Sequence, residues 1–159
     1  MRFSRKLTAL SMALVVCCTA ACTDLDGTWS LLSFTIYRPG GAPLEMQGTG
    51  TLWFDDFGYV RMTLDADAAS AALLTEAGIP MEKNRFVTWG RAIIDKRSKT
   101  LKYVNYAFEG QYPAVTARPV AVERLCYWNV AGSTLTLTTK DESGKPLSIG
   151  RWRKWFAID

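Results

Sequence analysis

The residues that could carry out chemistry in this sequence differ from those of most enzymes in one respect: the chain contains no histidine. Histidine is the commonest general base and the commonest metal ligand in proteins, so its absence excludes most mechanisms built on a histidine-paired nucleophile. Asp55 and Asp56 resemble a paired carboxylate, but adjacent strand residues face opposite ways, and these two lie in an expected hairpin loop. Turn chemistry therefore explains them better than acid–base catalysis does.

Cysteine occurs four times, without a CxxC or other metal-ligand spacing, so we expect neither a metal nor another cofactor. Cys17 and Cys18 lie in an apolar N-terminal run, where they act as small hydrophobic residues. Cys22 and Cys126 remain. If Cys22 is acylated, we expect Cys126 to be a buried free thiol. If it is not, a disulfide between the two is the alternative in an oxidising compartment.

Residues 1–21 have the organisation of a signal peptide. A basic start, MRFSRK, precedes the apolar run LTALSMALVVCC, which is too short to span a bilayer as a mature helix, and small residues then lead to Cys22. This arrangement resembles a bacterial lipoprotein signal, which implies a membrane anchor through lipid on Cys22, in the cell envelope and facing the periplasm. Because Thr23 is not Asp, the same resemblance favours the outer membrane. Secretion after cleavage at Ala21 and a retained anchor are the alternatives.

The charge of the chain changes once this leader is set aside. The net charge is +4, but removing Arg2, Arg5 and Lys6 from the 19 basic side chains leaves 16, against 15 acidic ones. A nearly neutral domain has no electrostatic footprint for nucleic acid, so we expect no nucleic-acid partner. We expect a monomer.

The chain after Gly27 has the pattern of short strands joined by turns. One helix is expected over 66–78, capped by Asp65 or Asp67 and stopped at 78–80. Residues 55–58 form an expected hairpin loop with Gly58 at positive φ. The strands are expected at 28–37, 50–54, 59–64, 86–95, 99–110, 119–128, 133–139 and 147–156.

This succession predicts an all-β fold: a single antiparallel up-and-down barrel of about eight strands. A parallel sheet is disfavoured because helices do not alternate with the strands, and closure into a barrel removes the exposed edges. The barrel domain is expected over 28–159, after a short membrane-proximal link at 22–27. A barrel of this size holds either a packed interior or one small ligand. The helix either closes one mouth of the barrel or covers its outside.

Several segments in this order resemble the bacterial lipocalin-like domain family over nearly the whole mature chain. They are LDGTWSLLSF, GTGTLWFDDFGYVRMTL, FVTWGRAIID, ERLCYWNVAGSTLTLTT and RWRKW. In lipocalins the Trp of Gly-x-Trp closes one barrel end beneath an Arg from the last strand. The resemblance implies this structural role for Trp29 with Arg151 or Arg153, and a guanidinium stacked on an indole gains a cation–π contact.

A ligand-binding barrel needs inward apolar side chains and a few polar groups that orient the ligand. Period-two alternation groups the residues of each strand but does not settle which group faces inward. For each candidate the alternative is core packing. The candidate ligand-binding residues are Phe54, Met62, Trp89, Tyr103, Tyr106, Phe108 and Trp128.

The leading functional hypothesis is an envelope lipoprotein that binds a small hydrophobic ligand inside a lipocalin-like barrel. One alternative is a barrel enzyme of cyclase or isomerase type, which needs a deeply buried titratable group with a perturbed pKa. The other is a protein-binding or inhibitor lipoprotein, which has a filled barrel and an exposed patch outside.

Overall fold

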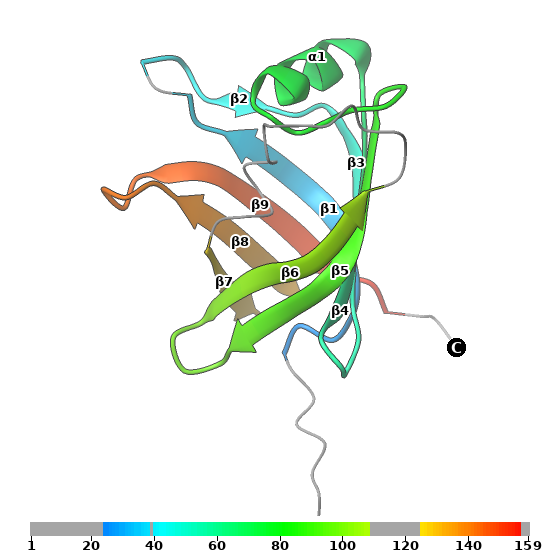
Figure 1. The fold of residues 1–159 in the computed structure, drawn as a ribbon, viewed down its shortest axis with the longest axis vertical. Helices are drawn as coiled ribbons and strands as arrows, with labels where there is room; N and C mark the ends of the chain where they lie inside the picture. The colour runs from blue at the N-terminus through cyan, green and yellow to red at the C-terminus, as the bar shows by residue number, and fades with distance from the viewer. Residues whose placement is uncertain (1–23, 39, 109–124, 157–159) are drawn as a thin grey trace, which may run out of the picture.

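The structure is a computed structural model that describes residues 24–38, 40–108 and 125–156, with the backbone alone for 105–108. Its strands close into a barrel (Figure 1), and the predicted fold class is confirmed. The elements are β1 (Gly27–Ile36), β2 (Leu44–Glu45), β3 (Gly48–Phe54), β4 (Tyr59–Ala66), α1 (Ala68–Glu76), β5 (Arg85–Asp95), β6 (Thr100–Phe108), β7 (Cys126–Ala131), β8 (Thr134–Lys140) and β9 (Pro146–Lys154).

The strands are joined in up-and-down order. Within the described residues, each strand from β3 to β9 pairs with the next one in the chain, and β1 lies antiparallel between β3 and β9. This last pairing closes the barrel. The sequence pattern did not predict β2, a two-residue strand that pairs with the end of β1.

The predicted strands agree with the observed ones to within two residues at each end, except for the one expected at 119–128. In the structure β7 begins at Cys126 and continues to Ala131, while 119–124 lie outside the described residues. The strand extends to Ala131 because it pairs with Thr134 across a tight turn in which Gly132 has a φ of 58°. Pairing with β8, rather than the apolar run in the sequence, therefore sets the C-terminal end of β7.

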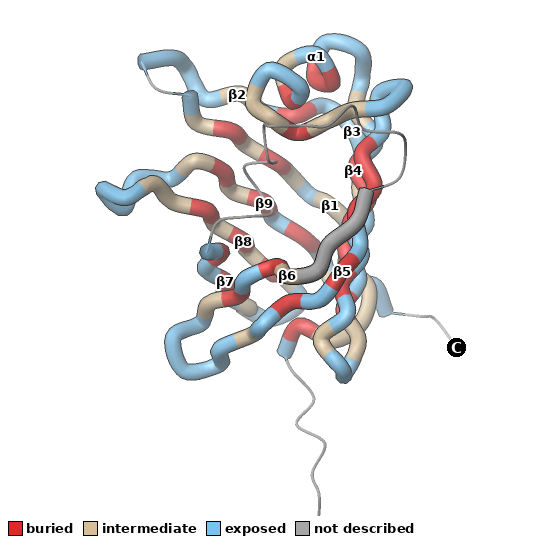
Figure 2. Tube along the Cα trace, in the orientation of Figure 1, coloured by how far each residue is buried: buried red, intermediate tan, exposed pale blue. Residues whose placement is uncertain are grey.

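Alternation of side chains builds one core inside the barrel. Val60, Met62 and Leu64 of β4 share one face of the strand and are all buried. Bands of buried residues recur along the other strands in Figure 2. At the β3–β4 turn, Gly58 has the predicted positive φ of 81°, and Asp55 accepts hydrogen bonds from the backbone of the loop.

Helix α1 covers the end of the barrel drawn uppermost in Figure 1. Asp67 is its N-cap and accepts a hydrogen bond of 2.7 Å from the backbone N–H of Ser70. The Ser70 hydroxyl in turn accepts one of 2.9 Å from Gln47, which ties the helix to the chain entering β3. Leu74 is fully buried and belongs to the barrel core. The helix therefore closes a mouth of the barrel, one of the two placements that the sequence left open.

The opposite end of the barrel is closed by Trp29, which is buried and donates its indole N–H to the carbonyl of Leu25 at 2.8 Å. The cation over its ring is Lys154, at 4.5 Å, and not Arg151 or Arg153. The expectation for those two arginines is wrong because Trp152 points inward, which turns both of its neighbours out to solvent.

Lys154 reaches back over the barrel end, where it also donates to the carbonyl of Asp26. Leu25 is fully buried. It therefore packs as part of the barrel, although it lies in the stretch expected to be a link.

The wall of the barrel is least continuous between β6 and β7. Within the described residues these strands share two residue pairs, Thr100–Tyr127 and Leu101–Cys126, whereas β7 and β8 share six. Beyond Leu101, β6 continues along β5 as far as Phe108. Among the described residues the two strands are therefore paired at one end.

Candidate functional site

The residues predicted to bind a ligand divide into groups by position. Phe54, Met62, Tyr103 and Trp128 are buried inside the barrel. Met62 and Tyr103 line an interior cavity, whereas Trp128 lies under the ammonium of Lys99 at 4.0 Å and donates its indole N–H to the carbonyl of Thr100. Trp128 therefore helps to close the end of the barrel.

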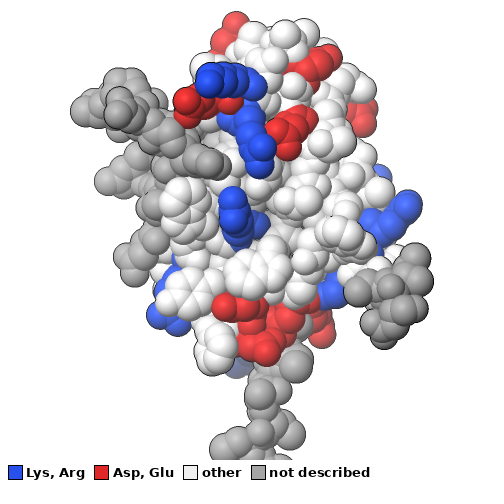
Figure 3. All heavy atoms as spheres, turned by 90° about the vertical axis from the view of Figure 1, so that its right-hand side faces the viewer, with Lys and Arg blue, Asp and Glu red and all other residues white. Residues whose placement is uncertain are grey.

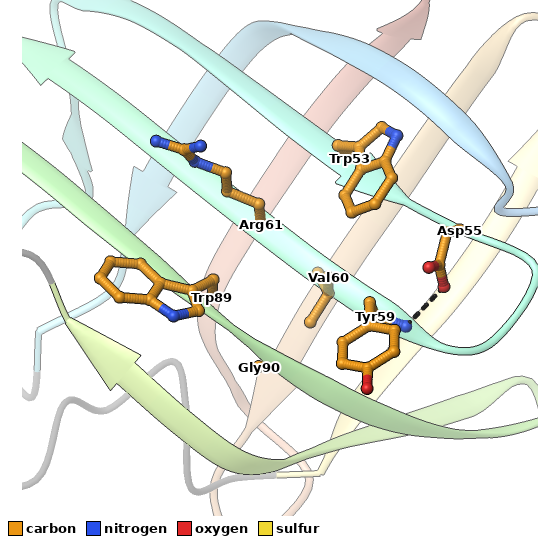
Figure 4. Close-up of a pocket in the computed structure, with 7 residues that line it drawn as sticks. All are labelled: Trp53, Asp55, Tyr59, Val60, Arg61, Trp89 and Gly90. Atoms are coloured by element: carbon orange, nitrogen blue, oxygen red, sulfur yellow. Dashed lines mark hydrogen bonds between the residues drawn. The ribbon is translucent and has the colours of Figure 1, made fainter.

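Trp89 is the candidate whose expected orientation is wrong. Its side chain is 43% exposed and lies on the outer face of the wall, as Figure 4 shows. The inward residues of β5 are instead Phe86, Thr88 and Ala92, which are buried in alternation with it. The side chains of Tyr106 and Phe108 lie outside the described part of the structure, as does Cys22.

The interior cavity has a volume of about 20 Å³ and lies among strands from both sides of the barrel. Its walls are mainly apolar or aromatic, with two hydroxyls on one side. Those hydroxyls, of Thr139 and Ser148, are hydrogen-bonded to each other at 2.7 Å across paired strands. The lining residues are Phe34, Met62, Tyr103, Cys126, Leu137, Thr139, Ser148, Gly150 and Trp152.

Two of these lining side chains carry buried polar atoms that have no hydrogen-bond partner among the described residues: the Tyr103 hydroxyl and the Trp152 indole nitrogen. They come from β6 and β9, which lie far apart in the sequence. Gly150 leaves room for this indole, because a Cβ at that position would lie 2.8 Å from the indole nitrogen. Nearly all buried polar groups in native proteins are paired, so two unpaired donors at one cavity need an explanation.

The two titratable groups at the cavity are neutral at physiological pH. Burial raises the pKa of the Tyr103 hydroxyl well above its ordinary value, and the neighbouring Cys126 thiol raises it further. Burial also raises the pKa of Cys126 to about 12. A thiol that keeps its proton is a poor nucleophile. These groups are therefore suited to donating hydrogen bonds to a ligand.

The described residues hold no other recognisable kind of chemical site. No carboxylate there is buried, and no group of three or more His, Cys, Asp or Glu side chains is placed to hold a metal ion. No helix among them combines the length and the apolar character needed to cross a membrane. Cys126 is buried and free.

Sequence reasoning missed several cavity residues, above all Trp152, Phe34 and Leu137. The signal for Leu137 was present, because Leu135 and Leu137 alternate with threonines over the first five residues of β8. No comparable signal joined Trp152 to Tyr103, because their proximity arises only when the barrel closes. No protein-family model matches this chain, and no curated protein matches its sequence.

Proposed function

We propose that this protein binds a small, mainly apolar ligand inside a lipocalin-like barrel, and that the ligand carries a hydrogen-bond acceptor. The observation behind the proposal is the pair of unpartnered donors, Tyr103 and Trp152, at one interior cavity. An unsatisfied buried polar group costs about 1–3 kcal/mol, so an acceptor that reaches both donors gains from pairing them. The apolar walls contribute burial of the ligand's hydrocarbon part.

The size of the cavity sets a condition on this proposal. Its volume of about 20 Å³ holds roughly one water molecule, so a larger ligand enters only if side chains move. Met62 is the wall residue best suited to move, because methionine is unbranched and adapts its rotamers at low cost. The short β6–β7 ladder is the part of the described wall with the fewest backbone pairs to separate.

Tyr103→Phe tests the proposal because it removes one donor and leaves the ring. The measurement is native mass spectrometry of protein purified from its own cell, which detects a ligand retained in the barrel. We expect wild type to carry an added mass and Tyr103→Phe to lose most of it. Tyr127→Phe is the matched control, because Tyr127 is exposed on the outside of the barrel. Wild type with the mass of the bare chain would count against the proposal.

The small volume of the cavity favours a second candidate: a protein-binding or inhibitor lipoprotein with a filled barrel. In this alternative the outer face makes the functional contacts, and Tyr103 and Trp152 pair at most with a single water molecule. Wild type and Tyr103→Phe would then have the same mass under native conditions. Binding of the partner protein would then be weakened only by substitutions on the outer face of the barrel.

We also propose that Cys22 anchors the protein by a lipid on the periplasmic side of the envelope. The basic, apolar and small-residue segments before Cys22 support this, and so does the short spacing from Cys22 to the buried Leu25. Such spacing would hold the barrel close to the membrane. Membrane fractionation tests the anchor: wild type should sediment with membranes, and Cys22→Ser should not. Equal distribution of the two proteins would refute it.

A further inference from the structure

The outer face of β3, β4 and β5 carries a second depression, of about 550 Å³, which is separate from the interior cavity. Trp53 pairs with Arg61, and Arg61 pairs with Trp89, so the three residues form one row across three strands. Paired positions of neighbouring strands place their side chains on the same face. Figure 4 shows Arg61 between the two indoles. Trp53 is 42% exposed and Trp89 is 43% exposed, and the two lie two strand spacings apart, roughly 10 Å.

Arg61 is the charge in this row without a partner, since it makes no ion pair or hydrogen bond with the residues that the structure describes. Its charged neighbours are engaged. Arg91 donates to the carbonyl of Phe57 at 3.1 Å and lies over the ring of Tyr59. Arg85 pairs with Asp65 at 3.7 Å. In Figure 4 the Arg61 guanidinium extends along the wall past the two indoles. A free guanidinium at the edge of this aromatic row is suited to holding a carboxylate through two parallel hydrogen bonds.

The rim of the depression adds groups that recognise hydroxyls. One carboxylate oxygen of Asp55 accepts hydrogen bonds from the backbone N–H groups of Phe57 and Tyr59, at 2.9 and 2.7 Å. Its second oxygen has no hydrogen bond within the described residues, and Asp55 is one of the residues that line the depression. The Tyr59 side chain is 49% exposed, so its hydroxyl is accessible as both donor and acceptor.

We propose that this depression binds an acidic oligosaccharide. Sugar rings have apolar C–H faces that pack on indoles and hydroxyl edges that pair with groups such as Asp55 and Tyr59. A single ring reaches one indole, whereas platforms roughly 10 Å apart need a chain of linked rings. An open depression on a wall admits a chain that continues past it in both directions. The free guanidinium of Arg61 makes a carboxylated sugar unit the preferred occupant.

A bilayer surface fits this face less well. Figure 3 shows basic side chains across the middle of this face and acidic ones toward both of its ends. The Asp55 carboxylate and the Asp65–Arg85 pair would lose hydration in the headgroup region of a bilayer, at a cost in free energy. A hydroxylated, hydrated ligand leaves those charges in water.

The test is NMR of the tryptophan indole N–H groups during titration with tetrasaccharides of galacturonate, glucuronate and mannuronate. We expect at least one of them to shift the Trp53 and Trp89 signals, assigned from Trp53→Phe and Trp89→Phe, and to leave those of Trp29 and Trp152 in place. Arg61→Gln should weaken this binding about tenfold or more, since it removes a charge-assisted pair. Arg151→Gln, an exposed arginine on β9, should leave it unchanged.

Three outcomes overturn the proposal. The first is no shift with any of the three acids. The second is equal affinity of wild type and Arg61→Gln. The third is binding to phosphatidylglycerol vesicles that requires Trp53 and Trp89 while the sugars have no effect, which would identify the surface as a lipid-docking site. Because both indoles are on the outside, the result is independent of whether the interior cavity binds a ligand.

Discussion

The barrel end that Trp29 closes (the closed end) and the middle of the barrel contain the same kinds of aromatic side chain. These side chains differ in their hydrogen-bonding environment. At the closed end, the indoles of Trp29 and Trp128 each donate their N–H to a backbone carbonyl, and each ring lies under a lysine ammonium. In the middle, the indole of Trp152 and the hydroxyl of Tyr103 are buried and have no hydrogen-bond partner in the part of the chain that the structure describes. The difference indicates that the aromatic side chains at the closed end stabilise the fold, whereas two donors in the middle remain able to form a hydrogen bond.

The largest expected effect is at the closed end. Trp29→Ala removes a fully buried indole, its hydrogen bond to Leu25 and its contact with Lys154. We expect the free energy of unfolding to fall by about 3–5 kcal/mol, the usual loss for an aromatic core truncation. Urea denaturation measures it. A loss below 1 kcal/mol would show that the closed end does not carry the stability assigned to it.

Two matched substitutions separate the hydrogen bond of Trp29 from the size of its ring. Trp29→Phe and Trp152→Phe both shrink a buried ring and remove an indole N–H, but only the first leaves a carbonyl without its donor. We therefore expect Trp29→Phe to destabilise the protein by about 1–3 kcal/mol more than Trp152→Phe does. Chemical denaturation of both variants in the same buffer checks this. Equal losses would mean that the hydrogen bond of Trp29 has no net value.

Alkaline pH should act on the middle of the barrel. The Cys126 thiol has a pKa of about 12 when folded, against 9.0 ordinarily, so in the window between these values the unfolded state binds fewer protons. The protonated thiol therefore makes its full contribution to the free energy of unfolding below the ordinary pKa of 9.0. That contribution is lost as the pH rises from this value toward the folded-state pKa.

Between about pH 8 and pH 10 we expect a loss of about 1 kcal/mol from this group. Cys126→Ala should lessen that loss. Urea denaturation at the two pH values provides the measurement, and an identical decline in wild type and variant would remove Cys126 as the cause.

The smallest effect is expected at the helix that covers the other mouth. The backbone N–H and then the hydroxyl of Ser70 lower the pKa of Asp67 below its ordinary 3.8. The ionised cap therefore stabilises the fold above that value, and this contribution is lost as pH falls through the lowered pKa. Asp67→Asn should differ from wild type slightly near neutrality and less below pH 3. Thermal unfolding across this range tests it, and a pH-independent difference would exclude the charge.

Much of the fold was predictable because its signals are local. Alternation predicted the strand β4, and turn residues predicted the loop at Gly58. The sequence offered Asp65 or Asp67 as the helix cap, and the structure has Asp67. The residues of the candidate site were harder to predict from the sequence. Met62 and Tyr103 were predicted and do line the cavity, but Trp89 was expected inside and lies outside. A pattern of period two is the same whichever face is inward, so only packing against other strands distinguishes the two.

From the sequence come the class of the fold, the order of its main strands and the stretch of chain that forms its helix, because propensity and turn chemistry act between neighbours in the chain. Only the folded barrel shows that the helix lies over one mouth, that Lys154 rather than an arginine covers Trp29, and that Tyr103 of β6 and Trp152 of β9 line one cavity. These features depend on distances across a closed barrel. Those distances follow from strand register and tilt around the whole circumference, which no local stretch of sequence contains.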